Sequence, residues 1–501
     1  MKKLYLFALF VFSLFLSGCV HHEEKVVTVI SSFEDSGNKV SESSYFKGQK
    51  KDCDWLVLMY MDGDNSLEYS LREDFNEVEQ GLSLIRNVDG SAKSGFYSVR
   101  VVVLWDGRQK KDSRIFELGA DIESNYAGEN TINIQNVGFI KKADNEVNMS
   151  SGSTLTDFIK WADNHYSAGK GKILHVADHG SGPGPNTRAM CEDSTAGTSA
   201  ISSKEFASAL TNAGAGNNKF SALLFDICLG SSIEDAYEFR NLADYMIASP
   251  NTTPGPGFDY VGVMQCFNKE NDSNEKIAVA IGQSFEDYYK GKTIVDSYTG
   301  EPMVSTVTVT NLSAVENCAD KIDALADSVL LVEKQTENSF KPYLLYNSGK
   351  NTICYKGTVN WLFDIGDFAR LVEKDSKSSE TVKTAASNVK TAASNVKTAA
   401  SNVKTALFGA IVYSWRWQSE KSGGNDYLSL YTDDSKGFCG LTICGGMANS
   451  SYTYDEYGKK IYDKTYPIPS WYITDIAFGS RNNGNSGWAK LIATWFGVYS
   501  N

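Results

Sequence analysis

The sequence predicts an α/β fold in which a mostly parallel sheet carries helices on both faces. Runs such as WLVLMYM, from Trp55, and VRVVVLW, from Val99, are apolar throughout, which is typical of strands buried on both sides. Segments with helical spacing alternate with these runs, as in parallel sheets. A hydrophobic content of 42% and a charged content of 22% over 501 residues indicate a globular chain with a large core.

The elements follow one another in a regular order. The strand at Trp55 ends in the turn-forming sequence D-G-D-N, and the helix after it carries apolar residues at helical spacing from Leu67 to Leu82. The later elements are YSVRVVVLWDG (strand), SGSTLTDFIKWADNHY (helix), KILHVADHG (strand), SSKEFASALTNAG (helix), KFSALLFDICLGSS (strand), SIEDAYEFRNLA (helix) and DYMIASP (strand). In such a sheet, functional groups gather at the carboxyl ends of the strands.

Residues 301–501 are expected to form a C-terminal region of mixed α/β structure beside a catalytic domain at 53–300. WLFDIGDFARLVEK, from Trp361, has a helical pattern. The heptad KTAASNV occurs three times over residues 383–403, so that a helix would present a valine every seven positions from Val382. Such a thin seam favours a lengthened helix over a coiled-coil oligomer.

The N-terminus predicts export. Lys2 and Lys3 precede the apolar run LYLFALFVFSLFL and a small-residue end, which indicates a signal peptide over residues 1–18; the run is too short for a comfortable permanent span. The sequence L-S-G-C resembles the lipobox of bacterial lipoproteins, which would make Cys19 the lipidated residue. Residues 19–52 are polar and are expected to be a flexible tether. We therefore expect an extracytoplasmic protein of the bacterial cell envelope, lipid-anchored at the outer membrane or cell surface.

Net charge and the placement of the cysteines argue against nucleic-acid binding, a disulfide framework and structural zinc. A net charge of -13 and a pI of about 5.1 argue against nucleic acid as a partner. The nine cysteines do not form a paired framework, and in a strand Cys439 and Cys444 would face opposite sides. No CxxC pair or His/Cys cluster predicts structural zinc.

Of the five histidines, His21 and His22 lie in the predicted tether, and three lie beyond it. His165 lies in the polar tail of a predicted helix, and we interpret it as a surface residue. His175 lies inside a buried strand, where a core histidine with satisfied hydrogen bonds is the simpler interpretation. His175 and His179 are four residues apart, but this spacing forms a metal pair on a helix and not in a strand. The sequence therefore assigns no metal ligands.

His179 stands where its strand stops and is followed by G-S-G-P-G. The strand SALLFDICLGSS ends with Cys228 in the equivalent position. A cysteine and a histidine at the same sheet edge supply the nucleophile and the acid/base group of acyl transfer. The backbone N–H groups of Gly180 and Cys228 are then natural donors to the oxyanion.

Asp226 lies two residues before Cys228, so in a strand both side chains point to one face. A carboxylate there can pair with a cationic group such as a guanidinium or an ammonium. The alternative is a structural aspartate that caps a loop amide. Asp178 would project to the opposite side and is a poorer candidate to orient His179.

Several stretches together resemble the clostripain family. These are WLVLMYMDGDNSL with its D-N-x-L end, KILHVADHGSG with H-G-x-G, and LLFDICLGSSIEDAYEFRNLADYMIASP with D-x-C-L; WLFDIGDFARL and FCGLTICGG match later landmarks more weakly. The histidine lies 49 residues before the cysteine, close to the caspase-type separation. The resemblance covers roughly residues 53–500. It implies a caspase-like fold, a Cys228/His179 dyad, an aspartate at 226 in the P1 pocket, and cleavage of proteins or peptides after arginine or lysine.

Two departures affect that expectation. The family commonly has Met-Gly after C-L, whereas Gly230 and Ser231 follow here. It also places a glutamate shortly after the following A-S, where this chain has Pro250 and Asn251. The first departure is expected to change local packing and the second a contact with the substrate.

Relatives often process themselves, and Arg188, between the two catalytic candidates, is the expected self-cleavage site. No cofactor is required by a Cys/His mechanism. Calcium occurs in some relatives, but no D-x-[DN]-x-[DN]-G loop is present, so the sequence leaves calcium open.

Three alternatives stay open. One is a caspase-fold peptidase with another P1 preference, such as asparagine or aspartate. Another is a non-catalytic surface lipoprotein that binds peptides through a degenerate peptidase scaffold. A serine hydrolase is disfavoured because the sequence has no G-x-S-x-G elbow.

Overall fold

The computed structural model does not describe residues 1–35, so the predicted signal peptide and Cys19 lie outside the described residues. The described residues are 36–122, 127–140, 146–183, 190–197, 199–295, 303–336, 340, 344, 354–356, 361–375, 378–393, 410–418, 438–446, 453–454, 460–461, 468–469, 472–473, 475–484, 486–496 and 498–499.

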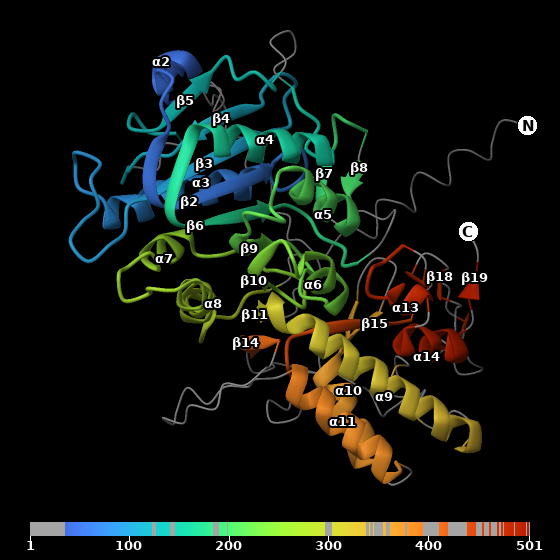
Figure 1. Ribbon diagram of the computed structural model, residues 1–501. Coiled ribbons are helices and arrows are strands. Elements are labelled where there is room, and N and C mark those ends of the chain that lie inside the picture. The colour runs from blue at the N-terminus through green and yellow to red at the C-terminus, as the bar shows by residue number, and fades with distance from the viewer. Residues whose placement is uncertain are drawn as a thin grey trace, which may run out of the picture.

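A ten-stranded sheet organises the molecule (Figure 1). Its order is β1-β5-β4-β3-β2-β6-β9-β10-β11-β14. The strands are β1 (Asn38–Ser41), β2 (Lys51–Asp62), β3 (Val99–Asp106), β4 (Arg114–Glu117), β5 (Ile132–Gln135), β6 (Tyr166–Ala177), β9 (Phe220–Asp226), β10 (Ala243–Ala248), β11 (Val304–Asn311) and β14 (Ile411–Gln418). The five central strands, β3 to β10 in the sheet order, are parallel, and β4, β11 and β14 join antiparallel. The predicted mostly parallel sheet is confirmed.

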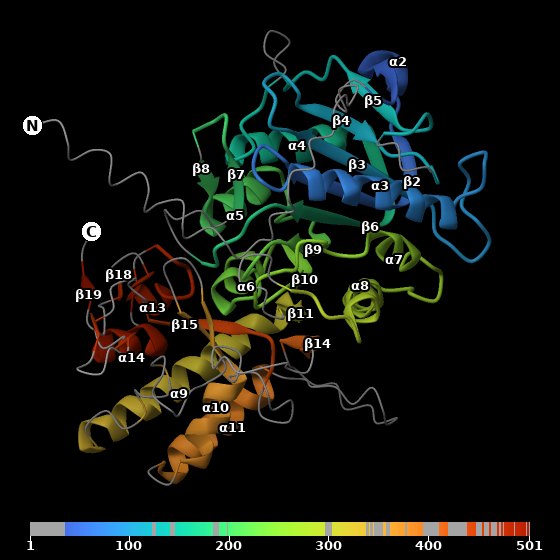
Figure 2. The ribbon, with the colours of Figure 1, turned by 180° about the vertical axis from the view of Figure 1, so that it is seen from behind.

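Each central strand buries both of its faces. In β2, Leu56 and Leu58 belong to one hydrophobic cluster, whereas Val57 and Met59 belong to the other, as the two-residue period of a strand requires. The first cluster contains α4 (Gly152–His165), α5 (Ser203–Asn212) and α6 (Ile233–Phe239), and the second contains α3 (Glu68–Ile85), α7 (Tyr260–Gln265) and α8 (Asn274–Tyr289). Figures 1 and 2 show these two helical layers on either side of the sheet.

The predicted tether is wrong for its second half. Residues Asn38–Ser41 form β1, which pairs in parallel with β5, and Glu42–Phe46 form the short helix α2. Ser41 caps this helix, and Phe46 is buried against Trp161 and Tyr166. The segment is polar and shows no strand pattern of its own. It becomes a strand because it pairs with β5, almost a hundred residues further along the chain.

The predicted boundary at residue 300 is also wrong as a division of the sheet. β11 pairs with β10 and β14 pairs with β11, so the C-terminal part completes the central sheet. A second sheet is formed by β12 (Cys354–Lys356), β13 (Trp361–Asp364) and β15 (Thr442–Gly446). Residues Trp361–Asp364, predicted as helix, are therefore strand, and α10 (Ile365–Lys374) begins only where Asp364 caps it.

The first part of the heptad repeat forms α11 (Glu380–Ala393). Val382 and Val389 are fully buried, and the helix packs on α9 (Val315–Thr336) and α10. The valine seam therefore contacts the same chain, and the repeat beyond residue 393 lies outside the described residues. The remaining elements are β7 (Met190–Asp193), β8 (Ser199–Ile201), η2 (Leu312–Ala314), β16 (Thr453–Tyr454), β17 (Lys460–Ile461), β18 (Ile468–Pro469), α13 (Arg481–Gly484), α14 (Gly487–Phe496) and β19 (Val498–Tyr499).

Candidate active site

The structure brings the two predicted catalytic residues out of neighbouring strands. β6 and β9 pair in parallel, and Ala177 lies opposite Asp226 at the last register position. His179 and Cys228 each follow that pair by two residues, so both stand at the same edge of the sheet. The two strands that carry them are thus direct neighbours in the sheet.

The two loops after these strands are in direct contact. A Cβ atom on Gly180 would lie 2.3 Å from the Cys228 carbonyl oxygen and 3.0 Å from the Cys228 nitrogen, so only glycine fits there. Leu229, the residue after the cysteine, has a φ of 61° and donates its N–H to the Asn251 carbonyl at 2.9 Å. A left-handed conformation at a leucine is unfavourable. The chain is thus held in a sharp turn directly behind the Cys228 side chain.

The loop after β2 supplies a partner to the histidine that the sequence analysis missed. Ser66 Oγ lies 2.9 Å from His179 Nε2, and Asn65 donates to the Asp178 carboxylate at 2.7 Å. Asp178 also accepts the backbone N–H groups of His179 and Glu192. Asp178 therefore fixes the backbone beside the histidine. The position of D-N-S-L at the carboxyl end of a strand was the signal that could have pointed to Asn65 and Ser66.

A small hollow beside Cys228 contains two carboxylates. Its volume is about 30 Å³, which holds water and excludes an arginine or lysine side chain. Asp226 and Asp74 both line it, together with Cys228 and the loop from Thr253 to Gly257. Asp74 comes from α3, far from the cysteine in sequence, and no sequence motif identified it.

Asp226 accepts hydrogen bonds from the segment that follows Gly257 and also lines the hollow. Its Oδ2 accepts the Phe258 N–H at 3.0 Å and the Tyr260 hydroxyl at 2.7 Å, so the structural role weighed as an alternative is present. Both bonds use Oδ2, which leaves Oδ1 engaged in neither. Burial raises the pKa of Asp226 to about 6, although these two hydrogen bonds act to lower it. Burial, followed by the charges of Asp226 and Glu77, raises the pKa of Asp74 well above its usual range.

The other two histidines have structural surroundings. His175 is fully buried, its Nε2 lies 2.6 Å from the Tyr260 hydroxyl, and burial lowers its pKa to about 3. The core interpretation of His175 is confirmed. His165 is only partly exposed, stacks on Phe46 and Trp161, and lies 3.2 Å from Glu42. Its interpretation as a simple surface residue was wrong because α2 covers it.

At the two departures from the family pattern, Ser231 and Asn251 make hydrogen bonds that hold the loop after Cys228. Ser231 is buried, donates its hydroxyl to the Gly440 carbonyl, and accepts both the N–H and the hydroxyl of Thr442. Asn251, besides accepting from Leu229, donates its side chain to the Val304 carbonyl. These contacts tie the segment that follows the cysteine to β11 and β15 of the C-terminal part.

Seven cysteines, Cys439 and Cys444 among them, are buried thiols. Three acidic side chains from separate segments, Asp64, Asp106 and Glu146, also come together near the loop after β2. Arg188 lies in residues 184–189, outside the described residues, between Pro183 and β7.

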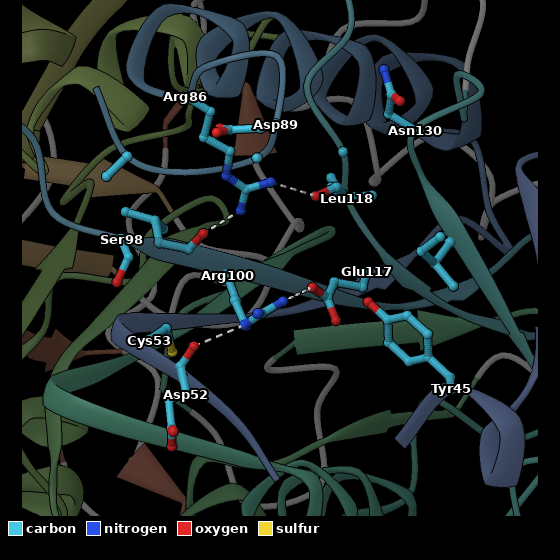
Figure 3. A pocket seen from close by; sticks show the side chains of 15 residues that line it. Tyr45, Asp52, Cys53, Arg86, Asp89, Ser98, Arg100, Glu117, Leu118 and Asn130 are labelled. Carbon is cyan, nitrogen blue, oxygen red and sulfur yellow. Dashed lines mark hydrogen bonds and ion pairs between the residues drawn. The ribbon is translucent and has the colours of Figure 1, made fainter. Parts of the chain in front are cut away.

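A larger cavity, of about 300 Å³, lies at the opposite ends of the strands (Figure 3). Arg100 pairs with Glu117 there, and Arg86 donates to the carbonyls of Leu118 and Val99. Burial raises the pKa of the Cys53 thiol to about 12, so this cysteine stays protonated and unreactive. Volume alone would thus have selected the wrong end of the sheet.

Comparison with known proteins agrees with this arrangement. A family model described as Clostripain family matches residues 59–475. Clostripain from Hathewaya histolytica is 25% identical over 505 residues, covering 92% of this chain and 88% of the relative.

Two solved structures share the fold. A secreted C11 cysteine protease from Bacteroides thetaiotaomicron, solved with an irreversible peptide inhibitor, has a TM-score of 0.54 and 20% identity, covering 85% of this chain and 98% of its own. An inactive zymogen C11 protease from Parabacteroides distasonis has a TM-score of 0.50 and 20% identity, covering 79% and 92%. The large, mostly parallel sheet with flanking helices is caspase-like, as expected. This chain belongs to the clostripain family and is a cysteine peptidase.

Proposed function

We propose that this peptidase hydrolyses peptide bonds after arginine or lysine, with Cys228 as nucleophile and His179 as its acid/base partner. The observation that carries the proposal is the placement of both residues beyond the paired ends of β6 and β9, where Cys228 lines a hollow together with the carboxylates of Asp226 and Asp74. Substrates are proteins or peptides, and the chemistry requires no cofactor.

The reaction follows from these groups. His179 accepts the thiol proton, and the Cys228 thiolate attacks the carbonyl carbon of the substrate. The backbone N–H groups of Gly180 and Cys228 are proposed to bind the oxyanion. His179 then protonates the departing amine, which leaves a thioester. Water attacks the thioester while His179 takes its proton, and that proton returns to the departing sulfur.

The P1 preference rests on charge. Asp226 and Asp74 line one hollow, and after burial it is the charge of Asp226 that most raises the pKa of Asp74. A guanidinium or ammonium group placed between them would offset that repulsion, and a neutral P1 side chain would not. Asparagine or aspartate at P1 is the competing preference, and an acidic P1 side chain would add a third negative charge.

The N-terminal proposals concern residues outside the described part. We propose that residues 1–18 are removed and that Cys19 carries the lipid anchor of an extracytoplasmic, envelope-bound protein. Within the described residues, no helix is long and apolar enough to cross a membrane. Metabolic labelling with a fatty acid tests the anchor: the wild-type chain should incorporate label, and label retained in Cys19→Ala would contradict the proposal.

Self-cleavage at Arg188 is proposed because the segment lies between the two catalytic residues. Expression of the chain with Cys228→Ala should leave it intact, and Arg188→Ala should stop processing at that position. Unchanged processing in Arg188→Ala would place the cleavage site elsewhere.

The proposed activity is tested with fluorogenic peptides that differ only in P1: arginine, lysine, asparagine or aspartate. Wild-type protein should cleave after arginine and lysine, and Cys228→Ala should lose about 10³-fold or more of that activity. Cys266→Ala, which changes another buried cysteine away from the site, is the matched control and should stay within about twofold. Thiol-dependent cleavage after asparagine or aspartate alone would favour the other P1 preference.

A further inference from the structure

We propose that the core residue His175 is a positioning residue for substrate recognition, which acts through Tyr260 to hold the Asp226 carboxylate beside the nucleophile. His175 lies inside β6, Tyr260 begins α7, and Asp226 ends β9. His175 Nε2 lies 2.6 Å from the Tyr260 hydroxyl, which donates to Asp226 Oδ2 at 2.7 Å. A continuous chain of hydrogen bonds thus runs from the core to the hollow. Its consequence for the substrate rests on the proposed role of Asp226 at P1.

The strand period places both ends of this chain on one face of the sheet. Leu224 lies opposite His175 in the pairing of β9 with β6, and Asp226 follows Leu224 by two residues, so its side chain points to the same face. Tyr260 packs on that face, with its ring edge-on to the His175 imidazole at a centroid separation of 5.2 Å. Its backbone N–H also donates to Glu77 of α3 at 3.0 Å. The tyrosine is therefore fixed from both sides.

The donors and acceptors of this chain can be assigned. Burial lowers the pKa of His175 to about 3, so its imidazole is neutral and has a single N–H. Tyr260 has one hydroxyl hydrogen, and an ionised Asp226 only accepts, so that hydrogen lies toward Asp226. The Tyr260 oxygen then accepts from His175, which places the histidine hydrogen on Nε2. Nδ1 has no hydrogen-bond partner in the described part of the chain, and in this tautomer no buried N–H is left without an acceptor.

The chain favours the form of Asp226 that a cationic substrate needs. Burial raises the pKa of Asp226 to about 6, and the hydrogen bond from Tyr260 is the strongest influence that lowers it. Donation by His175 polarises the tyrosine hydroxyl and strengthens that bond. Both hydrogen bonds that Asp226 accepts among the described residues use Oδ2. The chain therefore stabilises the carboxylate and leaves Oδ1 for the substrate.

The other titratable groups around Asp226 do not supply this stabilisation. Asp74 and Glu77 face it from α3, and Tyr289 faces it from α8. Burial, and with it the charge of Asp226, raises the pKa of each of the three. None of these side chains is a cation, so the hydrogen bond from Tyr260 is the side-chain contact that offsets the burial of Asp226.

A double-mutant cycle on the full chain tests the proposal with a P1-arginine peptide. At pH 7, Tyr260→Phe should lower kcat/KM about tenfold or more and move the acidic limb of its pH profile to higher pH, because Asp226 loses a hydrogen bond that favours ionisation. His175→Leu should lower it about threefold or more. His175→Gln, whose amide offers an N–H in place of Nε2–H, should stay within about twofold. In the Tyr260→Phe background, His175→Leu should change kcat/KM by less than about twofold.

Tyr166→Phe is the matched control, because it removes a buried hydroxyl from the carboxylate of Glu117 at the opposite end of the sheet. It should leave kcat/KM within about twofold and the pH profile in place. A loss from His175→Leu that is the same with and without the Tyr260 hydroxyl would overturn the proposal, since the histidine would then act through the core alone.

NMR of the Cys228→Ala protein labelled with ¹⁵N-histidine reads the chain without activity. The His175 signal, assigned by its loss in His175→Gln, should be that of a neutral ring with its hydrogen on Nε2 from pH 5 to 8. A hydrogen on Nδ1 would overturn the proposal, and this measurement stands even if His175→Leu does not fold. Cleavage after neither arginine nor lysine would instead refute the proposed function, whichever tautomer is found.

Discussion

The two ends of the central strands hold two polar cavities with opposite electrostatics. At the carboxyl ends, Asp226 and Asp74 share a hollow beside Cys228 and repel one another. At the amino ends, Glu117 is paired with Arg100 and also accepts the Tyr166 hydroxyl. Each cavity has a buried cysteine at its wall, Cys228 or Cys53. Among the described residues, the larger cavity is lined by a carboxylate and the arginine paired with it, whereas the smaller one is lined by carboxylates and by no arginine or lysine.

This difference explains why size is a poor guide to function here. In an ion pair within the protein, each charge is already neutralised by its partner, so the pair attracts a charged ligand only weakly. Two neighbouring carboxylates repel one another, which lowers the stability of the fold. Such destabilising arrangements are common at functional sites. Matched substitutions at the two cavities test that contrast.

The largest expected effect is on activity. Asp226→Asn should lower kcat/KM for a P1-arginine peptide by about 10²- to 10³-fold, because the amide cannot balance the guanidinium charge. Asp74→Asn should lower it by about tenfold. Glu117→Gln, the same chemical change at the opposite cavity, should leave kcat/KM within about twofold. Equal losses in Asp226→Asn and Glu117→Gln would mean that both act through folding.

The stability effects of the same two variants should have opposite signs. Asp226 has a pKa of about 6 in the folded protein, above its unfolded value, so its ionised form destabilises the fold increasingly as pH rises from about 4 to 6. Asp226→Asn should therefore raise the free energy of unfolding at pH 7 by about 3 kcal/mol. Glu117→Gln should lower it by about 2 kcal/mol, because Arg100 loses its partner. Denaturant unfolding of both proteins in the Cys228→Ala background measures this, and two changes of the same sign would refute the contrast.

The smallest effect is the pH dependence. The carboxylate form of Asp226 is needed to bind a P1 cation, so the advantage of wild type over Asp226→Asn should shrink as pH falls through about 6. Taking the ratio of kcat/KM values for wild type and variant cancels the pH effects that both proteins share. A ratio that stays constant between pH 5 and 8 would show that Asp226 does not carry the charge recognised at P1.

Much of the central fold could be read from local patterns. Apolar strands such as β2 and β9 and the helix with Leu71, Phe75 and Val78 on one face bury side chains at the periods that the sequence displays. Residues at strand ends were also predictable, because His179 and Cys228 follow their strands directly. The polar strand β1 and the edge strands β11 and β14 were not, since their pairing depends on partners distant in the chain.

The sequence by itself determined the chemistry of the site: a cysteine, a histidine, a glycine and an aspartate, each fixed by its distance from the end of a strand. Only the tertiary structure decided what surrounds them. Asp74 and Ser66 come from segments far from Cys228 in the chain, and the segments of Ser231 and Asn251 are tied to the C-terminal part by hydrogen bonds. The physical reason is range. Strand and helix periods are local, whereas charge repulsion, burial and hydrogen bonding act between side chains that only the folded chain brings together.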